Sequence, residues 1–139
     1  MKSASPYLVF NGACEEAFHF YRAAFGGEFA ALMRRKDAPS LSASETSTAA
    51  GEKIIHIELP LSATHSLFGY DVYSEAPAET ASHSLINIIP DDKAEADKLF
   101  AGLATGGEVV APLGETYFGS YFGMLADKFG VRWMLNCEE

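Results

Sequence analysis

Two side chains with acid-base chemistry lie two positions apart in a stretch with strand-like composition. His56 and Glu58 belong to the segment 54–61, in which apolar residues alternate with other types. Side chains two positions apart on a strand point to the same face, so the imidazole and the carboxylate would stand side by side. Such a pair can move a proton near neutral pH or hold a ligand amine. The alternative is a hydrogen-bonded, half-buried His56, with Glu58 at the surface or paired with an arginine, because one His-x-Glu pattern has low specificity.

Aromatic residues, one in the first half of the chain and five in the second, offer a surface for planar or apolar ligands. The cluster that could line such a pocket consists of Tyr70, Tyr117, Phe118, Tyr121, Phe122 and Trp133. Core packing or subunit contact is the alternative for any one of them. We therefore expect acid-base roles for His56 and Glu58, and ligand-binding roles for Tyr70, Tyr117, Phe118, Tyr121 and Trp133.

The elements that must position these residues occur in the same order twice. In the first half, an apolar run at 7–10 precedes apolar residues with helical spacing over 13–25. In the second half, an apolar run at 84–89 precedes a helical pattern over 92–105 with acidic residues in its first turn. Both helical patterns end at a Gly-Gly-Glu sequence, at 26–28 and at 106–108.

Three strand-like runs follow each Gly-Gly-Glu, so each half is expected to fold as β-α-β-β-β. The runs are 29–35, 54–61 and 66–72 in the first half, and 109–113, 120–126 and 131–137 in the second.

Two segments fall outside this repeat. Residues 37–53 are rich in Ser, Ala and Thr and have no apolar period, so they predict a lid, a partner-binding loop or a disordered segment. Residues 74–83 predict a linker. We expect a single domain over 1–139, with module one at about 5–73 and module two at about 84–139.

Composition limits the class of protein. The 139 residues are 48% hydrophobic and 21% charged, which is typical of a globular domain without a membrane span. The net charge of −9 disfavours nucleic acid and suits either a cationic ligand or simply solubility. Two cysteines, Cys14 and Cys137, are too few for a disulfide framework and fit no zinc motif. Residues 1–6 lead into no signal-peptide core, so we expect a cytoplasmic location.

Three separated motifs resemble one family. The first is Tyr-Leu-Val-Phe-Asn-Gly-Ala-Cys-Glu-Glu-Ala-Phe-His-Phe-Tyr at 7–21, the second is Lys-Ile-Ile-His at 53–56, and the third is Phe-Gly-Met-Leu-Ala-Asp-Lys-Phe-Gly-Val-Arg-Trp-Met-Leu-Asn at 122–136. With the repeated βαβββ order, the chain resembles the vicinal oxygen chelate superfamily (glyoxalase, bleomycin resistance protein, dioxygenase). Within it, the motifs resemble the PhnB-like branch, which is often labelled 3-demethylubiquinone-9 3-methyltransferase-like. The resemblance implies an α+β fold of tandem βαβββ modules with a curled, half-open mixed sheet, and a homodimer.

The resemblance also allows two tests of chemistry. Metal-dependent members of that superfamily place ligands on the first and last strand of each module. In this chain the positions are Pro6 or Tyr7, Phe68, Leu85 and Met134, of which only Tyr7 could coordinate a divalent cation. We therefore expect no metal at the usual place and no cofactor. A methyl-donor loop is not expected either, because the Gly-Gly pairs follow the helices instead of preceding them.

One departure from the branch bears on the substrate. The branch commonly has Trp-Gly-Asp-Arg where this chain has Phe-Gly-Ser-Tyr at 118–121. The substrates of better-known members are therefore not carried over.

These observations favour a homodimeric protein that binds an unidentified small molecule and has neither nucleic acid nor membrane as a partner. Whether a reaction is catalysed is left open, because no complete set of nucleophile, base and oxyanion donors can be assembled. One alternative is a metal-dependent lyase or dioxygenase with a relocated site built from His56, Glu58 and Glu115 or Asp127. The other is a drug- or toxin-sequestering resistance protein.

Overall fold

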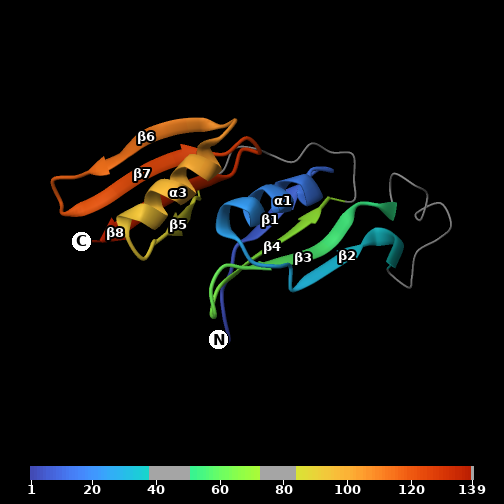
Figure 1. Cartoon of the computed structure of the whole chain (residues 1–139). Helices are drawn as coiled ribbons and strands as arrows, with labels where there is room; N and C mark the ends of the chain where they lie inside the picture. Colours follow the sequence, from blue (N-terminus) through green and yellow to red (C-terminus); the bar gives the residue numbers. More distant parts are fainter. Residues whose placement is uncertain (38–50, 73–83, 139) are drawn as a thin grey trace. The chain divides into compact units, whose positions relative to one another are not determined.

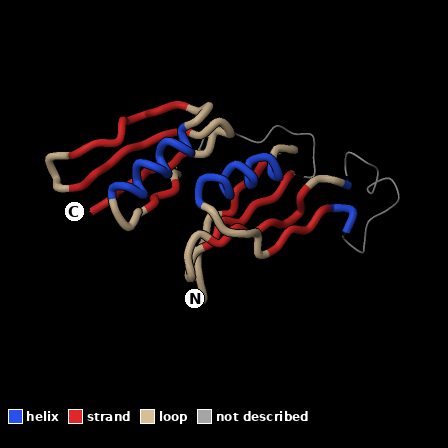
Figure 2. Tube along the Cα trace, in the orientation of Figure 1, coloured by secondary structure: helices blue, strands red, loops and turns tan. Residues whose placement is uncertain are grey.

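The structure is a computed structural model that describes residues 1–37, 51–72 and 84–138. The chain divides into two compact units, Met1–Ala78 and Glu79–Glu139, which we call module one and module two and describe separately. In the described residues each module carries one α-helix and one four-stranded mixed sheet. Figures 1 and 2 show the helix of each module beside its own sheet.

Some of the sequence predictions about organisation are not tested. The expected linker lies outside the described residues, and so does most of the expected 37–53 loop. Of that loop, Asp37 ends a short 3-10 helix, η1. The single-domain organisation stays a prediction.

Module one has the predicted order of elements. Its first strand, β1, lies parallel to β4, and β4, β3 and β2 follow antiparallel to one another, so the sheet order is β1-β4-β3-β2. The elements are β1 (Tyr7–Phe10), α1 (Cys14–Phe25), β2 (Ala31–Arg34), η1 (Arg35–Asp37), β3 (Ile54–Pro60) and β4 (Ser66–Asp71).

Module two repeats this arrangement with the sheet order β5-β8-β7-β6, in which β5 is parallel to β8 and the other pairs are antiparallel. Its elements are β5 (Ile86–Ile88), α3 (Lys93–Ala104), β6 (Glu108–Glu115), β7 (Ser120–Ala126) and β8 (Arg132–Glu138). The predicted fold of two βαβββ modules is therefore confirmed, and neither four-stranded sheet closes into a barrel.

The core of module one lies between α1 and one face of its sheet. Ala17, Phe18 and Tyr21 are fully buried, at the three-and-four spacing that brings helix residues to one side. Phe18 packs on the sheet where Gly69 has no side chain, because a Cβ at that position would lie 2.4 Å from Phe18 Cε1. Burying a ring of this size stabilises the fold by about 1.5–3 kcal/mol.

The core of module two is anchored by Trp133, which is fully buried. Its indole Nε1–H donates to Asp127 Oδ2 at 2.9 Å. The other oxygen, Asp127 Oδ1, accepts from the backbone N–H groups of Phe129 and Val131 at 2.9 and 3.0 Å, and so holds the turn between β7 and β8. Trp133 was expected to line a ligand pocket, but its burial and this hydrogen bond make it a core residue of module two.

Candidate functional site

The side chains of sheet one divide into two faces. Ile57, Leu59 and Leu67 are buried on the face that α1 covers. Because strand side chains alternate, the residues between them point to the opposite face, which we call the open face of module one. Across the strands, one row of it consists of Tyr7, Phe68, Glu58 and Ala31, and a second contains the pairs Val9 with Tyr70 and Met33 with His56.

A compact group of rings forms the centre of this face. Tyr7 Oη and His56 Nδ1 are hydrogen-bonded at 2.7 Å. The Phe68 ring is stacked against both of them, with centroid distances of 5.7 Å to Tyr7 and 5.7 Å to His56. Tyr70 contacts Tyr7 edge-on at 5.5 Å. When the imidazole proton is on Nε2, the tyrosine hydroxyl donates to Nδ1, and the Nε2–H is then the group directed away from Tyr7.

Glu58 adds a carboxylate beside these rings. It is the cross-strand neighbour of Phe68, and its Oε2 accepts a hydrogen bond from Ser66 Oγ at 2.8 Å. Within the described parts of the chain, no lysine or arginine forms an ion pair with it. The open face therefore combines an imidazole, a phenol and a carboxylate without a paired cation.

The structure brings together three of the residues that the sequence analysis selected. His56, Glu58 and Tyr70 all lie on the open face. Tyr117 and Phe118 belong instead to the turn between β6 and β7 in module two, where they are 100% and 58% exposed and their rings pack against each other at 5.2 Å.

The remaining two predicted aromatics, Tyr121 and Trp133, lie on the α3 side of sheet two. Tyr121 Oη donates to Asp97 Oδ1 on α3 at 2.6 Å, and this hydrogen bond raises the pKa of Tyr121. Trp133 is in the core. The expected aromatic set is therefore divided between two modules and, within module two, between a turn and a helix-covered face.

Two residues of the open face were missed as ligand-binding candidates. Tyr7 and Phe68 entered the sequence analysis only as poor metal ligands, and their pairing with each other is set by the parallel register of β1 and β4. The signal available in the sequence was the alternation of Phe68 and Tyr70 with the buried Leu67 and the small Gly69.

The same positions in module two carry different chemistry. The row that corresponds to Tyr7, Phe68, Glu58 and Ala31 consists of Asn87, Met134, Met124 and Ala111. Asn87, and not Leu85 as expected, is thus the first-strand residue opposite Met134. In the next row, Phe122 pairs with Asn136, whose Oδ1 is buried without a hydrogen-bond partner in the described residues.

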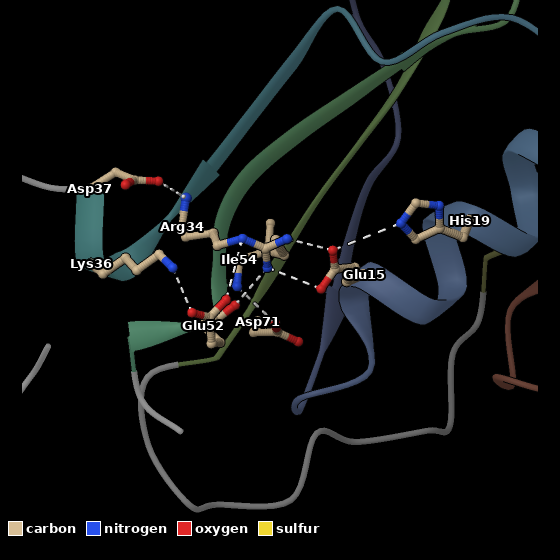
Figure 3. Close-up of polar contacts among 8 residues, drawn as sticks. All are labelled: Glu15, His19, Arg34, Lys36, Asp37, Glu52, Ile54 and Asp71. Carbon is tan, nitrogen blue, oxygen red and sulfur yellow. Dashed lines mark hydrogen bonds and ion pairs between the residues drawn. The ribbon is translucent and has the colours of Figure 1, made fainter. Parts of the chain in front are cut away.

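A polar network at one end of sheet one fixes the strand that carries His56 (Figure 3). The carboxylate of Asp71 is 3% exposed and accepts from three backbone N–H groups, those of Gly12, Cys14 and Ile54, at 2.8, 3.0 and 3.0 Å. It thereby joins the end of β4 to the first turn of α1 and to the start of β3, two residues before His56.

The same network ties β2 to α1. The Arg34 guanidinium donates to both carboxylate oxygens of Glu15 and lies 3.5 Å from Glu52 Oε2. Lys36 forms a second ion pair with Glu52. The hydrogen bond from Arg34 lowers the pKa of Glu15, and the same bond raises the pKa of Arg34. These contacts are structural supports for the sheet and do not reach the open face.

The described residues contain no group of three or more His, Cys, Asp or Glu side chains that could hold a metal ion. The residues named for a relocated metal site are also engaged elsewhere, since Glu115 pairs with Lys93 and Asp127 holds its own turn.

A surface hollow lies along α1 and is lined by His19, Arg22, Ala23 and Gly27. Because α1 covers the face opposite the open face, this hollow and His56 lie on opposite sides of the sheet. The aromatic-lined pocket stays a prediction. Within 1–37, 51–72 and 84–138, no helix has the length and apolar character needed to cross a membrane.

Known proteins are similar to this chain in sequence and fold. Residues 4–135 match the Glyoxalase/Bleomycin resistance protein/Dioxygenase superfamily. Protein YjdN of Escherichia coli (strain K12) is 29% identical over 136 residues, which cover 95% of this chain and 92% of that protein. The crystal structure of protein PA1353 from Pseudomonas aeruginosa has 39% identity and a TM-score of 0.84, with 98% of this chain and 97% of that chain covered. A PhnB protein from Bacillus cereus has 26% identity and a TM-score of 0.77, with 97% and 98% covered.

Proposed function

We propose a function from one premise: the chain belongs to the Glyoxalase/Bleomycin resistance protein/Dioxygenase superfamily. We infer that this chain binds a small organic molecule on the open face of module one. The observation that carries this proposal is the hydrogen-bonded pair of Tyr7 and His56, which contacts the rings of Phe68 and Tyr70 and lies beside Glu58. Aromatic platforms with a few convergent polar groups are typical of sites for planar ligands.

His56 and Glu58 are the residues that would act on the ligand. Both project from β3 to the same face, so a ligand lying on the rings can reach an imidazole and a carboxylate together. An imidazole next to a carboxylate equips the face for proton transfer or for holding a polar group of the ligand. Module two offers no counterpart, because Phe122 and Met124 occupy the equivalent positions.

The proposal does not use the metal of the superfamily. The superfamily's ligand positions, on the first and last strand of each module, correspond to Tyr7 and Phe68 in module one and to Asn87 and Met134 in module two. This set lacks an imidazole, a thiolate and a carboxylate, which are the side chains that hold divalent transition metals, so the residues do not fit a metal centre. Binding is assigned instead to stacking and hydrogen bonds.

We also retain the homodimer and the cytoplasmic location as proposals. Apolar side chains of module two support the dimer, since Val110, Tyr117, Phe118 and Ile89 are 54%, 100%, 58% and 63% exposed and would gain from being covered. Sedimentation as a stable monomer at micromolar concentration would contradict the dimer. Cys14 and Cys137, which are both free and buried, fit a reducing compartment.

The binding site is tested by substitution of His56. Thermal melts of the purified protein against a set of planar fragments should identify compounds that raise the melting temperature of the wild type. His56→Ala should abolish that increase. His65→Ala, which removes an exposed histidine from the turn before β4, should leave it unchanged. If the same fragments stabilise wild type and His56→Ala equally, the assignment of the site is refuted.

A further inference from the structure

We propose that the ligand of the open face carries a protonated amine on a planar ring, an inference that rests on the binding function proposed above. Two features of the face indicate this class of ligand: the charge of Glu58 and the rings next to it. The net charge of the whole chain favours the same class. No other charged side chain is placed on this face by the strand register.

Glu58 supplies the charge. One carboxylate oxygen, Oε2, accepts from Ser66 Oγ, and in the described part of the chain neither oxygen has a cationic partner. A half-buried carboxylate loses part of its hydration, and a cation that donates a hydrogen bond to it compensates for that loss. The hydroxyl of Ser66 holds Oε2 in place, so the carboxylate is already oriented when a ligand arrives.

The rings supply the second part of the recognition. Phe68 is the cross-strand neighbour of Glu58. The ring centroids of Tyr7 and His56 each lie 5.7 Å from the ring centroid of Phe68. A planar ring can stack on this group, and a cation within about 6 Å of an aromatic face is attracted by the quadrupole of that ring. A ring with an attached ammonium group would satisfy the platform and the carboxylate at the same time.

The charge of the whole chain acts in the same direction. With 19 acidic and 10 basic residues the formal net charge is −9, so cations are attracted and anions repelled at long range. This attraction is screened by salt, whereas stacking on the rings is not, and the two contributions can therefore be separated by varying the ionic strength.

Three molecules with the same ring and different charge test the inference. They are 1-naphthylmethylamine, which is a cation at neutral pH, 1-naphthylmethanol, which is neutral, and 1-naphthoate, which is an anion. Calorimetric titration of the full chain should show that the amine binds about tenfold more tightly than the alcohol, with the acid weakest. High salt should reduce the difference in affinity between the amine and the alcohol.

Glu58→Gln is the informative variant, because glutamine has the same shape and can still accept from Ser66 while it lacks the charge. In this variant the amine and the alcohol should bind with affinities within about twofold of each other. Glu16→Gln removes the same charge from an exposed position on α1 and should retain the preference for the amine. Circular dichroism melts of both variants establish that they are folded.

The outcomes separate the ligand class from the binding function. If the alcohol or the acid binds the wild type as tightly as the amine does, or if the preference survives in Glu58→Gln, the ammonium class is overturned while binding on the open face stands. If none of the three naphthyl compounds binds, both the ligand class and the planar-ligand function are overturned.

Discussion

Tyr7 restricts what His56 can offer to a ligand. The hydrogen bond of 2.7 Å occupies Nδ1, which leaves Nε2 as the imidazole atom available on the open face. Phe68 lies against both rings and limits their movement. At the scale of single residues, the proposed site therefore has an imidazole hydrogen-bonded to Tyr7 and a carboxylate hydrogen-bonded to Ser66.

Removing the hydroxyl of Tyr7 should weaken this arrangement while the ring stays. We expect Tyr7→Phe to lower the free energy of unfolding by about 0.5–1 kcal/mol, since one partly exposed hydrogen bond is lost. Urea denaturation measures the change. Tyr117→Phe removes a hydroxyl from a fully exposed tyrosine and should have no measurable effect. Equal losses in the two variants would show that the Tyr7–His56 bond is not formed in solution.

The ion pair between Glu15 and Arg34 should make stability depend on pH. Because the hydrogen bond from Arg34 lowers the pKa of Glu15 in the folded state, its stabilising contribution is present above the ordinary carboxyl pKa and is lost as the pH falls through the lowered value. Glu15 is 42% exposed, so solvent screening limits the contribution to about 0.5–1 kcal/mol.

Glu15→Gln should therefore be less stable than the wild type at pH 7, and the difference should disappear in acid. Denaturant melts between pH 2 and 7 measure it, with Glu16→Gln as the matched control. A difference that stays constant over this range would contradict an electrostatic origin.

At the scale of elements, the two helices are accommodated by glycines in different strands. In module one Ile57 pairs with Gly69, and in the equivalent place in module two Gly123 pairs with Leu135. In each case the glycine makes room for a helix phenylalanine, Phe18 or Phe100, because a Cβ would lie 2.4 or 2.8 Å from its ring. The glycine that makes this room lies in β4 in module one and in β7 in module two.

A methyl group at Gly69 should disturb this packing. We expect Gly69→Ala to destabilise the protein by about 1–3 kcal/mol, because Phe18 must shift inside a packed core. Gly114→Ala is the control, since a Cβ there meets nothing within 4 Å, and its effect should stay within about 0.5 kcal/mol. Thermal unfolding compares the two. Equal stability of both variants would contradict the packing of α1 on β4.

The elements could be predicted because their signals are local. The spacing of Ala17, Phe18 and Tyr21 predicted α1, and the run at 120–126 predicted β7 with its observed ends. Which face a residue occupies could not be predicted in the same way. The sequence groups Trp133 with the ligand-binding aromatics, whereas its complete burial and its hydrogen bond to Asp127 place it in the core of module two.

The open face required long-range information. Tyr7 and His56 are separated by 49 positions, and they meet only because β1 and β3 both flank β4 in the sheet. The pair His56 and Glu58 was accessible from the sequence because it depends on strand alternation alone. Its partners were not, because they depend on the register of β4 with each neighbour.

At the scale of the whole molecule, the two modules share one strand arrangement and differ in the side chains that their sheets carry. The strand orders and the row registers correspond, yet the imidazole and carboxylate of module one are replaced by Phe122 and Met124 in module two. Both modules thus have the same strand arrangement, while in the described residues these two rows carry an imidazole and a carboxylate only in module one.

Chemical-shift mapping tests the central claim most directly. Amide resonances of the full chain, labelled with ¹⁵N, would be followed while the tightest-binding member of the naphthyl series is added. The account predicts that the largest shifts occur in β1, β3 and β4, at Tyr7, His56, Glu58, Phe68 and Tyr70. Shifts concentrated in module two, or along α1 around His19 and Arg22, would contradict it.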